Sequence, residues 1–476
     1  MVDAKQLVEW FPNKKAKAPG MKNANVFYRN LEEALDIKRA ENATFTIRKN
    51  EPNPRSMDFS TLDFLHLSKS GLIRQPFLDE LSAHPDFHLG AGGSRLLNGN
   101  NAYTDEAEKE IAEFHSGETS LLFHSGFEAN VAIMVSVPRP GDAIVFDELV
   151  HASMHEGMQT SKALCKKSFK HNDTESFREV LLEIRESEQM IREGKRSILV
   201  ALESLYSMDG DLCPLKELIE IGGEIFPDGN IQFFVDEAHT TGVFGHQGRG
   251  FVNELGLEHK VAIRMHTYGK ALACTGASVV CNDTVRDTLV NTARCFIYST
   301  APSFPMVAAI KAGYYLMRSG QTEALQDNIR HNVKHFCKTM SEHEIWDEAN
   351  DEGILRIPNM DDWENNPMIT QVMPVMTRQR YTKFLCYHLQ LQSLNCFPID
   401  YPVVPRGFNR LRIVFHATNT EAEVEHLANS ICEWAQEMLL LEESGKGGVR
   451  IPSAARQVNE AHAAAELGRA GVPSGP

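Results

Sequence analysis

The sequence of 476 residues lacks any apolar run of the length, about 18 residues, that a helix needs to cross a bilayer. It also lacks an excess of positive charge, because 48 Lys and Arg residues stand against 64 Asp and Glu residues. The net charge of −16 disfavours a nucleic-acid partner, whose phosphates bind to basic surfaces. The composition therefore predicts a soluble protein without a membrane span and without bound nucleic acid.

Paired cysteines are missing as well. The nine cysteines are an odd number, and no two of them form a C-x-x-C motif, so neither a disulfide framework nor a zinc knuckle is indicated. The first 20 residues hold no apolar signal-peptide core, and the last three form no peroxisomal or ER-retention signal. These features predict a cytoplasmic protein in a reducing compartment.

Two familiar catalytic motifs are incomplete. Residues 236–239 (Asp-Glu-Ala-His) resemble the acidic box of a helicase, but the phosphate-binding G-x-x-x-x-G-K-[ST] loop of such a motor is absent. His151 and His155 have the i, i+4 spacing of helical metal ligands, yet the Glu of H-E-x-x-H is missing. We therefore predict neither a nucleic-acid motor nor a metal site.

Short apolar runs alternate with helical stretches over residues 76–315. The strand candidates are Leu121–Phe123, Ala143–Phe146, Ser197–Leu202, Ile231–Val235 and Ala277–Cys281. Such alternation is typical of βαβ units. It predicts an α/β domain with a mainly parallel central sheet and helices on both faces.

Three further regions surround this large domain. Residues 1–75 are expected to form an N-terminal arm, with helical spacing over 26–50 that ends before Pro52. Residues 316–443 are expected to form a smaller C-terminal α+β domain. Its predicted elements are strands at Met368–Met376 and Arg410–Phe415 and a helix at Glu421–Leu441. Residues 444–476, rich in Gly, Ala and Ser, are expected to be a disordered tail.

Acidic residues directly follow three of the predicted strands. Asp147, Glu203 and Asp236 each stand where an apolar run ends. A single such carboxylate is most often a helix cap or a turn former, but ligands of open α/β sheets bind at the carboxyl ends of strands. Three carboxylates at equivalent points therefore predict one shared crevice.

Lys270 lies among small residues just before the strand at Ala277–Cys281. A lysine in such a setting loses its proton more readily and can bind an aldehyde covalently. Pyridoxal phosphate needs such a lysine together with a carboxylate for its ring nitrogen, and Asp236 is a candidate. Ser125 to Phe127 open a helical stretch, whose backbone N–H groups suit a phosphate.

The order of motifs resembles the α-oxoamine synthases, a family of fold-type I pyridoxal-phosphate enzymes, over about residues 58–440. The motifs are Gly-Gly-Ser-Arg (92–95), Phe-His-Ser-Gly-Phe (123–127), Asp-Glu-Leu-Val-His-Ala-Ser (147–153), Glu-Ser-Leu-Tyr-Ser-Met-Asp-Gly-Asp (203–211), Asp-Glu-Ala-His-Thr-Thr-Gly (236–242), Gly-Arg-Gly (248–250), Thr-Tyr-Gly-Lys (267–270) and Arg-Leu-Arg-Ile (410–413). The segment Gly-Ser-Arg-Leu-Leu-Asn-Gly-Asn resembles the 8-amino-7-oxononanoate synthase branch most.

The resemblance implies a decarboxylative condensation of an amino acid with an acyl thioester, carried by coenzyme A or a carrier protein, in biotin or secondary-metabolite biosynthesis. It implies that Lys270 binds pyridoxal 5'-phosphate and moves the Cα proton, that Asp236 pairs with the ring nitrogen and that His151 stacks on the ring. The other implied contacts are His239 and Ser207 at the ring hydroxyl, Ser125, Gly126, Phe127 and Thr267 at the phosphate, and Arg412 at the substrate carboxylate. Ser299 and Thr300 match a hydroxyl pair that reaches the partner subunit's phosphate, which implies a homodimer.

The sequence departs from the family at several positions. Leu62 replaces an Asn, His66 a Gly and Val403 a Thr, while Asp400 and Phe45 stand where Arg is common. The loss of cationic and hydroxyl groups favours a longer or more apolar acyl chain over a short dicarboxylic one. Two alternatives remain open: an aminotransferase on the same scaffold, and a regulatory subunit, which the presence of Lys270 disfavours.

Overall fold

The computed structural model describes residues 4–7, 15–41, 43–45, 47, 56–378, 381–444 and 451–470. They divide into two compact units. The first unit contains Met1–Thr61, His331–Phe415 and Asn419–Pro476, and the second contains Leu62–Arg330 with His416–Thr418. Within the described ranges, no helix combines the length and the apolar character of a bilayer-spanning segment.

A seven-stranded sheet forms the centre of the second unit. Its order is β2-β8-β7-β6-β5-β3-β4. The strands are β2 (Thr119–Phe123), β3 (Ala143–Asp147), β4 (Cys165–Phe169), β5 (Ile198–Glu203), β6 (Ile231–Asp236), β7 (Ile263–Thr267) and β8 (Ala277–Cys281). Only β8 runs against its neighbours, so the other six strands end at the same edge. The predicted, mainly parallel sheet is confirmed.

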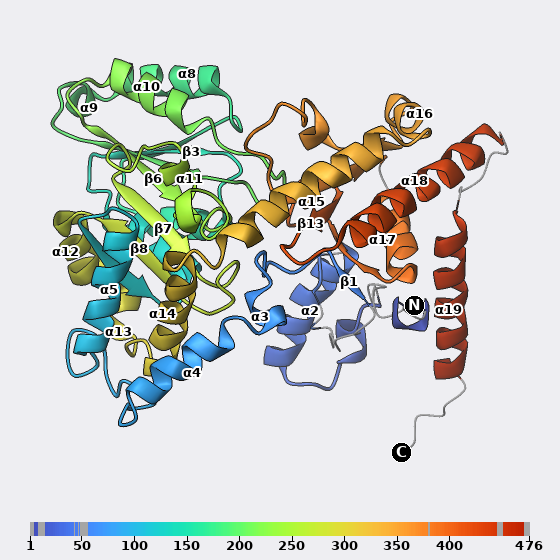
Figure 1. Cartoon of the computed structure of the whole chain (residues 1–476), viewed down its shortest axis with the longest axis horizontal. Helices are drawn as coiled ribbons and strands as arrows, with labels where there is room; N and C mark the ends of the chain where they lie inside the picture. Colours follow the sequence, from blue (N-terminus) through green and yellow to red (C-terminus); the bar gives the residue numbers. More distant parts are fainter. Residues whose placement is uncertain are drawn as a thin grey trace. The chain divides into compact units, whose positions relative to one another are not determined.

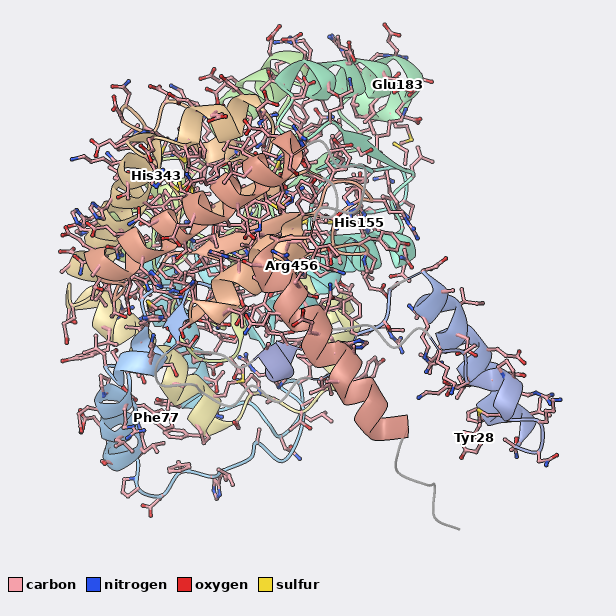
Figure 2. All side chains as sticks on the ribbon, turned by 90° about the vertical axis from the view of Figure 1, so that its right-hand side faces the viewer. Tyr28, Phe77, His155, Glu183, His343 and Arg456 are labelled. Carbon is pink, nitrogen blue, oxygen red and sulfur yellow. The ribbon has the colours of Figure 1, made fainter. Side chains whose placement is uncertain are left out.

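Helices flank this sheet (Figure 1), with α8 and α10 beside β4 and β6 and α5 and α6 beside β2 and β8. The longer helices are α4 (Arg74–Ala83), α5 (Ala102–Phe114), α6 (Gly126–Ser136), α7 (Ala152–Thr160), α8 (Thr174–Ser187), α10 (Leu215–Ile225), α12 (Asp283–Thr292), α14 (Phe304–Arg318) and the start of α15 (Glu323–Ser341). Single-turn helices are α3 (Leu67–Ser70), α9 (Gln189–Arg192), α11 (Phe251–Glu254) and α13 (Arg294–Tyr298). On α8, apolar residues at helical spacing (Phe177, Leu181 and Ile184) are buried, and the exposed side carries Glu183 (Figure 2).

The sequence did not predict two strands of this seven-stranded sheet, β4 and β7. β4 is an edge strand, and its two lysines, Lys166 and Lys167, break the apolar run that marks a central strand. β7 is central but contains the buried polar residues Arg264 and His266. Their partners come from other segments, since Arg264 Nη1 donates to the His115 carbonyl (2.6 Å) and His266 Nδ1 contacts Thr241 Oγ1 (2.9 Å).

The first unit is built around a four-stranded antiparallel sheet of order β12-β13-β10-β9. Its strands are β9 (Leu355–Arg356), β10 (Val372–Thr377), β12 (Phe397–Ile399) and β13 (Arg410–Val414), and a separate parallel pair joins β1 (Met57–Asp58) to β11 (Leu394–Asn395). Its helices are α1 (Ala4–Leu7), α2 (Val26–Ala40), the end of α15, α16 (Trp346–Asp351), α17 (Thr382–Leu391), α18 (Glu421–Glu443) and α19 (Ser453–Ala470). The predicted strands near 368–376 and 410–415 and the helix at 421–441 are confirmed.

The structure differs from the sequence-based predictions at both ends of the chain. The predicted disordered tail contains α19, because Ala454, Ala455 and Val458 recur at helical spacing and form a buried cluster with Leu7 and Tyr387. At the other end, helical spacing was predicted over 26–50, but α2 ends at Ala40, and residues 43–45 and 47 are not helical. The apolar side chains of α2 are exposed, among them Tyr28 (Figure 2).

A buried carboxylate joins the end of β6 to α11. Glu237 Oε2 accepts hydrogen bonds from Phe251 N (2.5 Å), Val252 N (3.2 Å) and Thr240 Oγ1 (3.1 Å). Gly250 has a φ of +106°, and a Cβ there would lie 2.2 Å from Glu237 Oε2, so only glycine fits. Burial raises the pKa of Glu237 to about 7, although the charge of Arg264 opposes this rise.

We predict that Glu237→Gln flattens the pH dependence of stability. Because the folded-state pKa lies above the ordinary value of 4.5, the protonated carboxyl stabilises the fold at low pH, and this contribution is lost as the pH rises to about 7. Urea unfolding should show the wild type losing on the order of 3 kcal/mol relative to the variant over this window. Glu224→Gln, at an exposed ion pair with Arg178, is the control and should keep the wild-type profile. Parallel profiles for wild type and Glu237→Gln would contradict the prediction.

Candidate active site

The predicted site residues of the second unit follow the carboxyl ends of its parallel strands. Ser125 follows β2, His151 follows β3, Ser207 follows β5, His239 follows β6 and Lys270 follows β7. The strand register pairs Glu203 with Asp236 at the ends of β5 and β6. One edge of the sheet therefore carries all five loops, as ligand sites of open α/β sheets do.

Asp236 is a buried carboxylate held by neutral donors. Its Oδ1 accepts from Ala238 N (2.9 Å), and its Oδ2 accepts from Asn130 Nδ2 (2.8 Å). Neither donor carries a charge, so both orient the carboxylate without neutralising it. The negative charge is thus available to a cationic group at the strand edge.

His151 is the N-cap of α7, and its imidazole is fixed by Ser153. Nδ1 accepts from Ser153 N (3.2 Å) and lies 2.7 Å from Ser153 Oγ, so the proton of the neutral ring is on Nε2. Burial lowers the pKa of His151, the charge of Asp236 raises it and that of Lys270 lowers it. The net shift is downward, which leaves a neutral, flat ring near neutral pH.

Asn130 links these two residues and was missed by the sequence analysis. Its Nδ2 donates to Asp236 Oδ2 (2.8 Å) and to Ser153 Oγ (2.9 Å), so both amide hydrogens are used. Asn130 is one turn after Gly126 on α6 and is buried. The sequence signal that could have identified Asn130 is its position four residues after the glycine of the Ser-Gly-Phe motif, because residues at i and i+4 share a helix face.

The N-terminus of α6 lies against β7. Ser125 caps the helix, with its Oγ accepting from Glu128 N (3.2 Å). A Cβ at Gly126 would lie 3.2 Å from Thr267 Cβ and 3.3 Å from Thr267 Oγ1, so a larger residue there would have to displace the Thr267 side chain by a few tenths of an ångström. The first-turn N–H groups of a helix suit an anion, and Thr267 Oγ1, which donates to the Gly276 carbonyl (3.2 Å), lies beside this turn.

Lys270 is half-buried in a compact loop after β7. Tyr268 N donates to the Gly276 carbonyl (2.9 Å) and Ala273 N to the Lys270 carbonyl (2.9 Å). Burial raises the pKa of Glu203 well above its ordinary value, the charge of Asp236 adds to this rise, and that of Lys270 opposes it. Because Lys270 follows β7 and β7 is parallel to β6, Lys270 lies at the same edge of the sheet as Asp236.

The remaining predicted residues of this unit lie at the same edge or near it. His239 is buried with its ring centroid 5.9 Å from that of Phe64, and Ser207 lies in a turn between Tyr206 and Asp211. The Phe127 ring stands edge-on to His151 at 6.4 Å. Ser299 and Thr300 follow α13 and line a small cavity together with His124 and Glu128.

Arg412 lies in the first unit, together with three of the residues that depart from the family pattern, Phe45, Asp400 and Val403. Arg412 is on β13, opposite Pro374 of β10 and Phe397 of β12, and burial lowers its pKa. Asp400, where Arg is common in the family, forms an ion pair with Lys383 (3.1 Å) and accepts a hydrogen bond from Asn409. Lys383 and Asn409 of the same chain therefore satisfy the Asp400 carboxylate.

His66 explains how the chain tolerates the loss of a family glycine. Its φ of +51° keeps the left-handed conformation that glycine favours. The buried ring stacks on His416 with a centroid distance of 4.1 Å, and Nδ1 hydrogen-bonds to Thr418 Oγ1. Leu62 precedes this segment, and its carbonyl accepts from Phe64 N (2.8 Å).

The residues of the second unit fit one kind of ligand. Asp236 suits a protonated ring nitrogen because its donors are neutral, and His151 presents a flat face. The capped start of α6 suits a phosphate, and Lys270 suits an aldehyde. Together these groups match pyridoxal phosphate.

Comparisons with known proteins agree with this chemistry. Residues 57–431 match the family "Aminotransferase class I and II". The chain is 49% identical over 454 residues to aminoacyl transferase sphA of Byssochlamys spectabilis, which covers 95% of this chain and 96% of that protein. It is 43% identical over 384 residues to 8-amino-7-oxononanoate synthase of Emericella nidulans, covering 80% of this chain and 90% of that one.

Solved structures share the fold. A serine palmitoyltransferase from S. paucimobilis with a bound pyridoxal phosphate adduct has a TM-score of 0.69 at 21% identity, covering 88% of this chain and 99% of that chain. The 8-amino-7-oxononanoate synthase from Francisella tularensis has a TM-score of 0.59 at 23% identity, covering 81% and 100%. The predicted fold, cofactor and family are confirmed, and the aminotransferase alternative is not favoured. The chain belongs to the α-oxoamine synthases, the pyridoxal-phosphate-dependent acyltransferases within the class I and II aminotransferase family.

Proposed function

We propose that this enzyme joins the Cα of an amino acid to the acyl group of a thioester, with loss of the amino acid carboxylate as CO2 and release of the thiol. The observation that carries the proposal is that His151, Asp236 and Lys270 lie at or directly after the carboxyl ends of the parallel strands β3, β6 and β7, with Asn130 bonding both Asp236 and the Ser153 that fixes His151. A lysine for the aldehyde, a flat imidazole and a carboxylate for the ring nitrogen are the parts that this chemistry needs.

The bound cofactor supplies an electron-withdrawing ring that takes up electrons from the substrate Cα. Lys270 would hold the cofactor before substrate arrives, and its amine would then move the Cα proton. Asp236 would pair with the protonated ring nitrogen, and His151 would lie against the ring and exclude water from that face. Arg412 orients the substrate carboxylate.

The other predicted residues complete the cofactor contacts. The phosphate would be held by Ser125, Gly126, Phe127 and Thr267, because the first turn of α6 supplies N–H donors and the Thr267 hydroxyl, which donates to the Gly276 carbonyl (3.2 Å), lies beside that turn. His239 and Ser207 hydrogen-bond to the ring hydroxyl and donate to the oxygen that becomes negative when the acyl group is attacked. Both follow strands that end at the Asp236 edge.

The acyl donor is proposed to carry a long or apolar chain, bound to coenzyme A or to a carrier protein. Phe45 and Val403, which stand where the family often has Arg and Thr, are 77% and 52% exposed, so neither is needed in the core. Such a donor favours secondary-metabolite biosynthesis over biotin biosynthesis. All nine cysteines lie in the described part of the chain and none of them is in a disulfide, which supports a reducing, cytoplasmic location.

The active unit is proposed to be a homodimer, with Ser299 and Thr300 reaching the phosphate of the partner subunit. Thr300 is exposed, and Tyr298 beside it is 72% exposed, so this segment offers side chains to a second copy.

The proposed reaction fixes the ratio of CO2 and thiol released to product formed. Incubation with a carboxyl-labelled amino acid and a fatty acyl thioester should release one CO2 and one thiol per product, because the carboxylate leaves as the new carbon bond forms. Radiometric trapping of CO2 and a colorimetric thiol assay measure both. Panels of amino acids and of dicarboxylic and long saturated thioesters then define the substrates, with a higher rate expected for the long chains.

Lys270→Ala is the control and should give neither CO2 nor thiol. A keto acid formed without label loss would instead identify an aminotransferase, and a faster rate with dicarboxylic thioesters would contradict the acyl-chain proposal.

Asn130→Leu is expected to lower turnover because it removes the amide that orients both Asp236 and Ser153. A lost buried hydrogen bond of about 1–3 kcal/mol corresponds to a reduction of roughly 5–150-fold in kcat/KM. Asn130→Asp should be worse, since a second carboxylate would face Asp236. Steady-state kinetics measure both, with Asn291→Leu on the exposed face of α12 as control. Activity within twofold of wild type for either variant would argue against this role.

Subunit complementation tests the shared site. A Lys270→Ala chain and a Ser299→Ala/Thr300→Ala chain should each be nearly inactive, and their mixed dimer should regain activity at one of its two sites. Co-expression with two affinity tags isolates the mixed dimer for assay. If Ser299 and Thr300 act within their own chain, the isolated mixed dimer stays inactive.

A further inference from the structure

An ion-pair cluster lies at the same sheet edge and has no part in the proposed reaction. It consists of one imidazole, His171, and two carboxylates, Asp147 and Asp211. Asp147 ends β3, His171 follows β4 and Asp211 follows β5. Three loops of the edge therefore meet at a single side chain.

Both ring nitrogens of His171 face a carboxylate. Nδ1 lies 2.9 and 3.1 Å from the two oxygens of Asp147, and Nε2 lies 2.8 Å from Asp211 Oδ2. Both nitrogens must carry hydrogen to make these bonds, so the ring is a cation. Burial alone lowers the pKa of His171, but the bonds and charges of Asp147 and Asp211 outweigh it and raise the pKa to about 10.

On one side, His171 holds the loop that leads to His151. The Asp147 side chain is fully buried and accepts from Leu149 N (2.9 Å) and Asn172 N (2.8 Å). The Asp147 carbonyl accepts from Val150 N (3.1 Å), which closes the turn before His151. The orientation of this carboxylate therefore sets the path of the chain into α7.

On the other side, His171 holds the turn that contains Ser207. The Asp211 carbonyl accepts from Tyr206 N (3.0 Å) and closes this turn, and Asn172 Nδ2 donates to the Asp211 carboxylate (2.8 Å). The His171 ring also meets the Tyr206 ring edge-on, with centroids 4.5 Å apart and planes at 81°. His171 thus contacts both ends of the turn.

We propose that His171 is a positioning residue whose two ion pairs tie the loop of His151 to the turn of Ser207 and so hold two sides of the cofactor site in register. The inference rests on the proposed placement of His151 and Ser207 at the cofactor. It goes beyond that placement because it assigns the coupling of the two loops to a side chain that does not touch the cofactor.

The ion pairs differ from simple packing in their pH dependence. A folded-state pKa above the ordinary value of 6.5 means that the stabilisation is fully present below about pH 6.5 and is lost as the pH rises through about 10. Tyr206 stays neutral over this range because burial raises its pKa. Glu148, which accepts the His171 backbone N–H (3.1 Å), is the other charged neighbour.

The test compares wild type with His171→Gln. The variant supplies an amide that can still donate hydrogen bonds but carries no positive charge. Titration of pyridoxal phosphate into the cofactor-free protein should show a dissociation constant raised roughly 10-fold. The thermal midpoint of the cofactor-free protein should fall most near pH 6.5 and least near pH 10. His335→Gln, at a more exposed pair with Glu425, is the matched control and should change neither quantity.

Two further variants, Asp211→Asn and His171→Gln/Asp147→Asn, keep the test decisive if His171→Gln alone folds poorly. Asp211 is 37% exposed, so Asp211→Asn should fold and show a smaller rise in the dissociation constant. Adding Asp147→Asn to His171→Gln removes the uncompensated buried charge and should recover part of the lost affinity. A thermal penalty equal at both pH values, or an unchanged dissociation constant in both single variants, overturns the proposal. The pH effect on the cofactor-free protein does not depend on the reaction, so its failure is distinct from a failure of the proposed function.

Discussion

The site depends on one constraint, a carboxylate buried at the carboxyl end of a central strand. Asp236 ends β6 between β5 and β7, where water cannot solvate it. Its donors, Asn130 and the backbone of Ala238, satisfy its oxygens but leave its charge. That charge acts on His151 and on Glu203, and the protonated cofactor ring is its natural counterion.

At this edge of the sheet, different parts of the fold carry the proposed reacting groups and the side chains that position them. The groups proposed to face the cofactor lie on the loops, whereas Asn130, which bonds Asp236 and Ser153, comes from helix α6 and His171 follows the end of β4. Asn130 and His171 each bond two neighbours at once, so replacing either one removes two interactions together. Departures from the family pattern are accommodated locally, as the stacking of His66 on His416 shows.

Much of the fold was predictable because its strands are apolar runs bounded by polar residues. β2, β3, β5, β6 and β8 fit that pattern. β7 does not, since Arg264 and His266 are satisfied by His115 and Thr241 from distant segments. The helix α19 was not predicted for a related reason. Its alanine-rich sequence has a weak apolar pattern, and the residues that pack against it, Leu7 and Tyr387, come from distant parts of the chain.

The sequence by itself determined the family and the cofactor, because these rest on ordered local motifs, and it predicted the roles of Lys270 and Asp236 from the residue types that the reaction requires. It also determined which loops carry the site, since each motif follows a recognisable strand. Only the tertiary structure decided which neutral group orients Asp236 and which cation joins Asp147 to Asp211. Asn130 is 106 residues from Asp236 and His171 is 40 from Asp211 in the chain. Strand order brings these residues together, and strand order is set by packing of the whole sheet rather than by any local pattern.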